Sequence, residues 1–249
     1  GERAGRVRDV TTLTGPFAFE APTVEGAVVR LPYRTGDGTS FTEVVELPVA
    51  APDTPEVRAA VRVLHLAAGV SYYKALAPVP LDVPALSAAE RALVTALYDE
   101  GLREFAYRNG IPVPMPIDLV EAAGGTEVVP ATAHGAGVLV PIGGGKDSAL
   151  VASLLPDGEL FAVNPVGAQR HLAEALGRPL LAATRTLDPA LRALNEAGAP
   201  NGHVPVTAIT SSISVLVAAC LGLGEVAMGI ERSADEPTVT TSDGVPVNH

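Results

Sequence analysis

One stretch decides the interpretation of this chain: Val138-Leu139-Val140-Pro141-Ile142-Gly143-Gly144-Gly145-Lys146-Asp147-Ser148-Ala149-Leu150. A short apolar run meets three consecutive glycines, and Lys-Asp-Ser then leads into a helix-like run. This order predicts a strand, an anion-binding loop and a helix, because glycines let backbone N–H groups approach an anion and a helix N-terminus carries partial positive charge. The alternative is a turn that merely joins strand to helix. The Lys-Asp-Ser run favours phosphate binding, since it adds a cation and a hydroxyl donor.

The loop lacks the Gly-x4-Gly-Lys-Ser/Thr spacing of a Walker A motif. It resembles instead the PP-loop of ATP pyrophosphatases, whose usual form is Ser-Gly-Gly-x-Asp-Ser, and Gly143 stands where that pattern has Ser. The resemblance implies that ATP phosphates are bound by Gly143, Gly144, Gly145, Lys146, Asp147 and Ser148.

Composition excludes several classes of partner and site. The chain has 249 residues, a net charge of −11 and 47% apolar residues. A nucleic-acid partner is disfavoured because phosphate backbones need a basic face. The single cysteine, Cys220, excludes an internal disulfide and a Cys-x-x-Cys metal site. The run from Val204 to Gly224 has no charged residue, but Pro205 and several hydroxyls favour a buried helix over a membrane span. Because residues 1–9 show no secretory signal, we expect a cytoplasmic protein.

The first half of the chain predicts short strands and then helices. Alternating residues Phe41, Glu43, Val45 and Leu47 favour a strand with one buried face, although Glu43 interrupts the apolar set. Strands are expected at 16–20, 27–33 and 41–47. Thr54 before Pro55 predicts one helix start, and Ser87 with Glu90 predicts a second helix that runs to Asn109-Gly110. His65 on the first helix is expected to be structural.

The proline- and glycine-rich segment 111–136 is interpreted as a connector. It predicts a boundary near residue 130. Residues 1–130 would form a β-hairpin and helical domain that binds substrate. Residues 131–249 would form the nucleotide-binding domain.

From residue 137 onward, strand and helix patterns alternate, which predicts a parallel sheet with helices on both of its faces. The expected strands are 138–142, 160–164, 179–184 and 226–230, and the expected helices are 147–155, 166–176 and 203–223. The predicted fold class is therefore α/β and PP-loop ATP pyrophosphatase-like, preceded by a smaller α+β domain. Asn164, Arg185 and Glu231 would share the carboxyl edge of the strands with the glycine loop, so Asn164 and Arg185 are expected to bind the nucleotide. Carboxylates of Asp147 and Glu231 are expected to hold Mg²⁺.

A polar stripe begins at His203 and continues through Thr207, Thr210, Ser211 and Ser214 along one face of the last predicted helix. Two interpretations remain open for the hydroxyls. They either bond to carbonyls of their own helix or face the nucleotide. His203 is expected to be functional because it would lie at a helix N-terminus.

Several strings together resemble the MurL family of UDP-N-acetylmuramoyl-L-alanyl-L-glutamate epimerases. They are Gly69–Lys74, Glu104–Gly110, Pro141–Ser148, Leu194-Asn195, Asn201–Thr207 and Gly244–His249. The resemblance implies that ATP adenylates the terminal glutamate, that pyrophosphate and AMP are released, and that a base exchanges the Cα proton. It also implies that family members continue beyond His249. Lys146 is expected to serve adenylation. The candidates for the base or acid are His203, Tyr72, Tyr73 and Lys74, and the sequence does not choose among them.

Two other functions compete with this one. A PP-loop ligase or amide synthase would need an ammonia or sulfur donor, for which no glutaminase motif or second cysteine is present. A non-catalytic adenine-nucleotide-binding module would need only the loop. The expected ligands are ATP, Mg²⁺ and a small-molecule substrate, with no membrane or nucleic-acid partner, and the sequence does not predict an oligomeric state.

Overall fold

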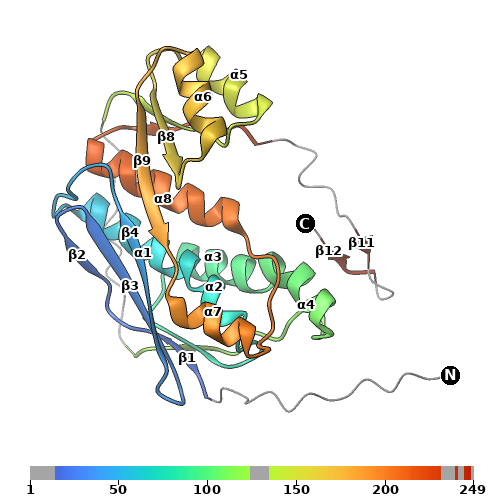
Figure 1. Cartoon of the computed structure of the whole chain (residues 1–249). Helices are drawn as coiled ribbons and strands as arrows, with labels where there is room; N and C mark the ends of the chain where they lie inside the picture. Colours follow the sequence, from blue (N-terminus) through green and yellow to red (C-terminus); the bar gives the residue numbers. More distant parts are fainter. Residues whose placement is uncertain (1–14, 124–134, 231–238, 241–243, 248–249) are drawn as a thin grey trace.

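The computed structural model describes residues 15–123, 135–230, 239–240 and 244–247 and builds most of its strands into one mixed sheet (Figure 1). The ten-stranded sheet has the order β10-β7-β8-β9-β4-β3-β1-β5-β6, with β2 paired to β3. Its principal strands are β1 (Phe17–Phe19), β3 (Val28–Thr35), β4 (Ser40–Glu46), β7 (Val138–Pro141), β8 (Glu159–Val163), β9 (Leu180–Thr186) and β10 (Glu225–Val226).

Strand β9 joins the two halves of this sheet. Its first residues pair in parallel with β8, up to Val163 opposite Ala183. Its last residues pair antiparallel with β4, where Val45 lies opposite Arg185. The four strands β10, β7, β8 and β9 are mutually parallel, as the sequence predicted. The sheet also runs across the predicted boundary near residue 130, so the two segments meet along β4 and β9.

Helices cover both faces of the sheet only in its parallel part. Helix α8 (Val206–Leu221) packs with α1 (Pro55–Ala68) in the larger apolar core. Helices α5 (Lys146–Leu154) and α6 (Gly167–Ala175) cover the opposite face of β7 and β8 in a smaller core and lie at the top of Figure 1. Helices on both faces were predicted for this parallel part alone, and they are present there. On the outer face of β3 and β4, Arg30 and Thr42 are exposed or half-buried. No helix among the described residues is both long and apolar enough to cross a bilayer.

The predicted helix starts in the first half are confirmed. The Thr54 hydroxyl accepts a hydrogen bond of 3.3 Å from the Val57 N–H at the start of α1. Helix α3 (Ala88–Tyr98) begins with a complete capping box: Ser87 accepts from the Glu90 N–H at 3.2 Å, and Glu90 accepts from the Ser87 N–H at 2.8 Å. These contacts lie within one helical turn, which is why the sequence predicts them well.

Two predicted helices have different bounds. The helix predicted to run to Asn109 is divided into α3, the 3-10 turn η1 (Glu100–Leu102) and α4 (Arg103–Asn109). A Cβ at Gly101 would lie 2.9 Å from the Pro205 Cγ, so glycine at this position lets the chain before α8 pack closely against η1. Helix α8 begins at Val206 because Pro205 disfavours helical backbone in the residue before it, and His203 therefore lies in a loop.

Short elements escaped the sequence analysis. They are β2 (Thr23–Glu25), α2 (Val70–Tyr73), β5 (Leu81–Val83), β6 (Leu119–Glu121), α7 (Pro189–Glu196), β11 (Val239–Thr240) and β12 (Pro246–Val247). The predicted strand 226–230 is confined to β10, at Glu225–Val226. Strand β6 lies inside the segment interpreted as a connector, and it pairs with β5 in parallel.

Buried His65 makes the fold sensitive to acid. Its ring is 5% exposed, its Nε2 lies 3.0 Å from the Pro32 carbonyl oxygen, and burial lowers its pKa from 6.5 to about 4. Between pH 6.5 and pH 4, His65 is protonated in the unfolded chain but stays mostly neutral in the folded protein. The free energy of unfolding therefore decreases as the pH falls through this range. We predict that this group accounts for about 3 kcal/mol of that loss.

The measurement is urea unfolding of the wild type and His65→Leu at pH 7 and pH 4. The variant is expected to lose less stability than the wild type between the two pH values. An equal loss in both proteins would contradict the prediction.

Candidate functional site

A pocket of about 580 Å³ lies where the connections of the parallel strands change direction. From β9 the order is β9-β8-β7-β10. The chain leaves β7 and β8 through α5 and α6 on one face, whereas it reaches β10 through α8 on the other. Such a switch point leaves a crevice at the carboxyl ends of the strands. The pocket is lined by residues 141–143, 145, 147–148, 161–163, 169, 207, 210 and 228–230.

The glycine loop forms one wall of this pocket. Gly144 has φ 86°, and a Cβ there would lie 2.8 Å from the Ala168 Cβ, so both its backbone and its neighbour require glycine. Gly143 and Gly145 differ, because a Cβ placed on either residue would meet no atom within 4 Å. Because glycine has no side chain, the space beside Gly143 and Gly145 stays open. An anion that approaches the loop backbone would need this space.

Two side chains hold the loop in this shape. The Gln169 amide at the start of α6 donates to the Gly143 carbonyl at 2.9 Å. The Ser148 hydroxyl donates to the Gly145 carbonyl at 3.0 Å. Ser148 was predicted to contact phosphate, but in this arrangement its proton serves the loop backbone, and its oxygen retains acceptor capacity.

The N-terminus of α5 faces the pocket without a side-chain cap. Its N-cap residue is Gly145, which has no side chain that could bond the first N–H groups of the helix. Asp147 lies in the first turn and lines the pocket, and exposed Lys146 precedes it. The second predicted metal ligand, Glu231, lies outside the described residues. Within the described part of the chain, no three His, Cys, Asp or Glu side chains gather into a metal site.

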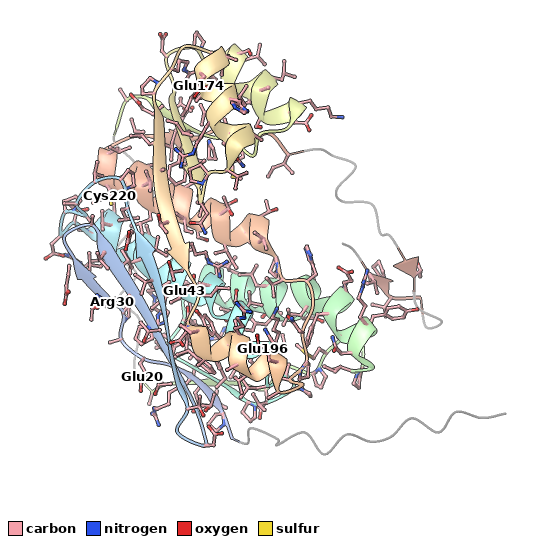
Figure 2. All side chains as sticks on the ribbon, viewed as in Figure 1. Glu20, Arg30, Glu43, Glu174, Glu196 and Cys220 are labelled. Carbon is pink, nitrogen blue, oxygen red and sulfur yellow. The ribbon has the colours of Figure 1, made fainter. Side chains whose placement is uncertain are left out.

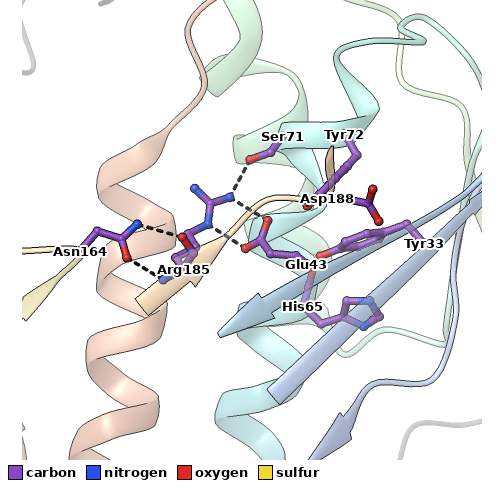
Figure 3. Close-up of polar contacts among 8 residues, drawn as sticks. All are labelled: Tyr33, Glu43, His65, Ser71, Tyr72, Asn164, Arg185 and Asp188. Carbon is purple, nitrogen blue, oxygen red and sulfur yellow. Dashed lines mark hydrogen bonds and ion pairs between the residues drawn. The ribbon is translucent and has the colours of Figure 1, made fainter. Parts of the chain in front are cut away.

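Arg185 and Asn164, both predicted to bind nucleotide, contact each other at the carboxyl edge of β8 and β9 (Figure 3). Asn164 has φ 47°, which Asn tolerates better than most residues. Its side chain accepts from the Arg185 N–H at 2.8 Å and donates to the Arg185 carbonyl at 2.8 Å. The Asn164 side chain therefore pairs with the β9 backbone and extends the contact between the two strands.

The Arg185 side chain forms a two-bond ion pair with Glu43 of β4, at 2.7 and 2.9 Å, and donates to the Ser71 hydroxyl at 2.9 Å. The Glu43 side chain is 0% exposed and that of Arg185 is 14% exposed. Burial raises the pKa of Glu43, and the Arg185 guanidinium opposes that rise. In this structure the guanidinium is held by Glu43, so a ligand would meet a cation that already has a carboxylate partner.

Lys74 and the loop before α8 come together at the same edge. The Lys74 ammonium donates to the Asn201 side-chain oxygen at 2.7 Å and to the Gly202 carbonyl at 2.9 Å. From α4, the Asn109 amide donates to the Asn201 carbonyl at 3.1 Å. Three of the strings that carried the family resemblance therefore meet here, and they fix the backbone that leads to exposed His203.

Tyr73 and Tyr72, both considered as catalytic groups, are 0% exposed. The Tyr73 hydroxyl donates to the Val79 carbonyl at 3.0 Å, and burial raises its pKa to about 12. The Tyr72 hydroxyl accepts from the Asp188 N–H at 3.0 Å, and burial also raises its pKa. Phenols in these surroundings stay protonated and packed, which favours a structural role for both.

The serines of the polar stripe bond within their own helix. Ser211 donates to the Thr207 carbonyl and Ser214 to the Thr210 carbonyl, both at 2.8 Å. This outcome matches the first of the two interpretations that the sequence left open. Thr207 and Thr210 do line the pocket, so the first turns of α8 form part of its wall.

Comparison with known proteins identifies the family. The sequence model of the MurL N-terminal domain matches residues 11–249. The chain belongs to the MurL N-terminal domain family. No solved structure matches it.

Relatives of this chain carry one name, UDP-N-acetyl-alpha-D-muramoyl-L-alanyl-L-glutamate epimerase. The protein from Salinispora tropica is 43% identical over 259 residues, covering 98% of this chain and 56% of the relative. The protein from a Micromonospora species is 44% identical over 222 residues, covering 84% and 49%. That from Xanthomonas oryzae pv. oryzae is 39% identical over 233 residues, covering 89% and 51%. The chain thus spans about half the length of the curated relatives it matches.

The sequence analysis missed the side chains that organise the site. Glu43 was noticed only as a break in the apolar face of a strand, and a charge on a buried face is itself a sign of a buried partner. Gln169, Asn109 and Asn201 gave no comparable signal, because each acts through a hydrogen bond to the backbone or side chain of another segment.

We predict that Glu43→Ala destabilises the fold by about 3–5 kcal/mol, because it leaves the Arg185 charge buried without its carboxylate. Glu20→Ala is the matched control: Glu20 pairs with Arg34 at the periphery, with 42% and 53% of the side chains exposed (Figure 2). Its loss is expected to cost about 1 kcal/mol or less. Urea unfolding at pH 7 measures both, and similar values for the two variants would refute the importance of the buried pair.

Proposed function

We propose that this chain binds ATP and takes part in epimerising the terminal L-glutamate of UDP-N-acetylmuramoyl-L-alanyl-L-glutamate. The observation that carries the proposal is the pocket at the switch point, whose wall is a glycine loop followed by an uncapped helix N-terminus. The name shared by the relatives supplies the substrate and the reaction. The parallel order of β9, β8, β7 and β10 also supports a PP-loop ATP pyrophosphatase-like architecture for this half.

The loop residues fit a triphosphate. Open space beside Gly143 and Gly145 gives access to backbone N–H groups, and the dipole of α5 favours negative charge at its first turn. Lys146 would add a cation beside them. Asp147 offers carboxylate oxygens of the kind that Mg²⁺ prefers, and Mg²⁺ bound there would neutralise phosphate charge.

The reaction follows from the acidity of the glutamate Cα proton. A carboxylate oxygen of the substrate attacks the α-phosphorus of ATP, the bond to the β-phosphate oxygen breaks, and pyrophosphate leaves. The resulting acyl adenylate no longer carries the carboxylate charge, so its carbonyl stabilises a Cα carbanion better. A base removes the Cα proton, a proton is returned to the opposite face, and hydrolysis releases AMP and the D-glutamyl product.

His203 is the proposed group for proton exchange. Its imidazole is exposed in the loop before α8, and histidine is the side chain that most often serves as a general acid or base. Lys74 and Asn109 donate hydrogen bonds to Asn201 and Gly202, and these bonds hold the backbone of the loop in place. Thr207, at the start of α8, already lines the nucleotide pocket. The reaction would take place at this shared edge.

We predict that Lys146→Ala lowers pyrophosphate release at least about 100-fold, because it removes a cation from the developing phosphate charge. The fold should remain intact, since the side chain is exposed. The assay combines the chain with ATP, Mg²⁺ and the UDP-linked dipeptide substrate. Arg192→Ala is the control, because Arg192 is an exposed cation paired with Glu196 on α7. Full activity in the Lys146 variant would contradict the assigned loop.

We predict that His203→Ala lowers turnover by about two to four orders of magnitude, the range for a lost acid–base group. Pyrophosphate release and solvent-deuterium exchange at the glutamate Cα are measured together. Release that persists while exchange fails supports the proton-transfer role. Exchange that persists while release fails would assign His203 to the nucleotide, and wild-type rates of both would make it structural. Release with no Cα exchange in the wild type would favour a ligase or amide synthase.

A further inference from the structure

The edge beside the nucleotide pocket carries a surplus of buried positive charge. Glu43, Arg185 and Lys74 form a cluster of one carboxylate and two cations, and their residues are buried or nearly so. Glu43 pairs with Arg185 through two hydrogen bonds. Lys74 donates to neutral oxygens of Asn201 and Gly202, and no carboxylate of the described residues forms an ion pair with it. Buried charges are normally paired, so the cluster is one anion short.

The ammonium of Lys74 also has donor capacity left. It carries three N–H groups, and the bonds to Asn201 and Gly202 use two of them. Burial and the nearby Arg185 charge both lower the pKa of Lys74. A bound carboxylate would reverse that effect, because an opposite charge favours the protonated form.

The distribution of lysine in the sequence points the same way. Only two of the 17 cationic side chains are lysines, Lys74 and Lys146, and the remainder are arginines. One lysine follows the glycine loop and the other belongs to the buried cluster. Lysine presents a compact charge with rotatable donors, which suits a single carboxylate held beside fixed backbone oxygens.

Residues that line the nucleotide pocket are close in sequence to residues that contact the cluster. Val163 lines the pocket, and the following residue, Asn164, pairs with the Arg185 backbone. Thr207 also lines the pocket, a few residues beyond the loop that Lys74 holds. A ligand that spans from the pocket to the cluster would need one group for the nucleotide and a second, anionic group.

A terminal glutamate has two such groups, an α-carboxylate and a γ-carboxylate. In the proposed function the α-carboxylate reacts with ATP, so the γ-carboxylate needs a separate partner. We propose that Lys74, supported by the Glu43–Arg185 pair, binds the γ-carboxylate of the substrate glutamate and so selects a glutamyl terminus. This inference rests on the proposed function and assigns Lys74 to substrate binding instead of proton transfer.

The test crosses two ligands with two proteins. The ligands are UDP-N-acetylmuramoyl-L-alanyl-L-glutamate and its L-glutamine counterpart, which keeps the α-carboxylate and replaces the γ-carboxylate by an amide. The proteins are the wild-type chain and Lys74→Met, and calorimetry measures each dissociation constant in the presence of Mg²⁺ and a non-hydrolysable ATP analogue. The wild type is expected to favour the glutamate ligand at least about tenfold, since a charge-assisted hydrogen bond is about twice as strong as a neutral one. The variant is expected to bind both ligands equally.

Wild-type binding of both ligands with equal affinity would overturn the inference, as would a variant that retains the tenfold preference. A variant that keeps the preference but loses Cα deuterium exchange would make Lys74 the base. Failure of the wild type to bind either ligand would overturn the proposed function itself, which keeps the two failures distinct.

A second measurement avoids any effect of the substitution on folding. Wild-type protein labelled with [¹³C]lysine should give side-chain signals from two residues, since the sequence has two lysines. The Lys74 signal is expected to shift on addition of the glutamate ligand and to shift much less with the glutamine ligand. Equal shifts with both ligands would count against the γ-carboxylate contact. Lys146→Arg assigns the two signals.

Discussion

The buried ion pair between Glu43 and Arg185 fixes how the two halves of the sheet join. Val45 lies opposite Arg185 in the β4–β9 pairing, and the pair with Glu43 locks that register from the covered face. A slip of one residue would turn Arg185 to the other face and leave Glu43 buried alone. Removing both charges from water costs free energy, which offsets much of what the ion pair gains. The pair therefore specifies the register of β4 and β9 more clearly than it adds to the net free energy of folding. It sets the position of the pocket beside the glycine loop relative to Lys74.

Features controlled by neighbouring residues were predictable from the sequence. Thr54 and Ser87 cap helices through bonds that close within a few residues, and the glycine loop follows a strand and precedes a helix as its pattern indicated. The mutually parallel strands of the second half also followed from local alternation of strand and helix. In each case, the information lay within one turn or one strand–helix unit.

Features that depend on distant segments were not predictable in the same way. Glu43 and Arg185 are 142 residues apart, and only the folded β4–β9 pairing brings them together. The helix start was misplaced at His203 because Pro205 moves it to Val206, although that signal was present in the sequence. In the break between α3 and α4, Gly101 packs against Pro205 too closely for a Cβ, and this tertiary contact was not visible in the local pattern. Local patterns therefore located the glycine loop, but they did not reveal which distant side chains hold one another.

The site accordingly has two parts with different origins. The described walls of the pocket beside the glycine loop come from residues 141–230, so the second half of the chain contains that part by itself. The cation cluster takes Glu43 and Lys74 from the first half and Arg185 from the second, so it exists only when β4 and β9 are paired. In the proposed function, phosphate binding would depend on a local motif, whereas recognition of a glutamyl group would depend on the whole sheet. This difference explains why the glycine loop was visible in the sequence, while the partners of Lys74 and Arg185 were visible only in the fold.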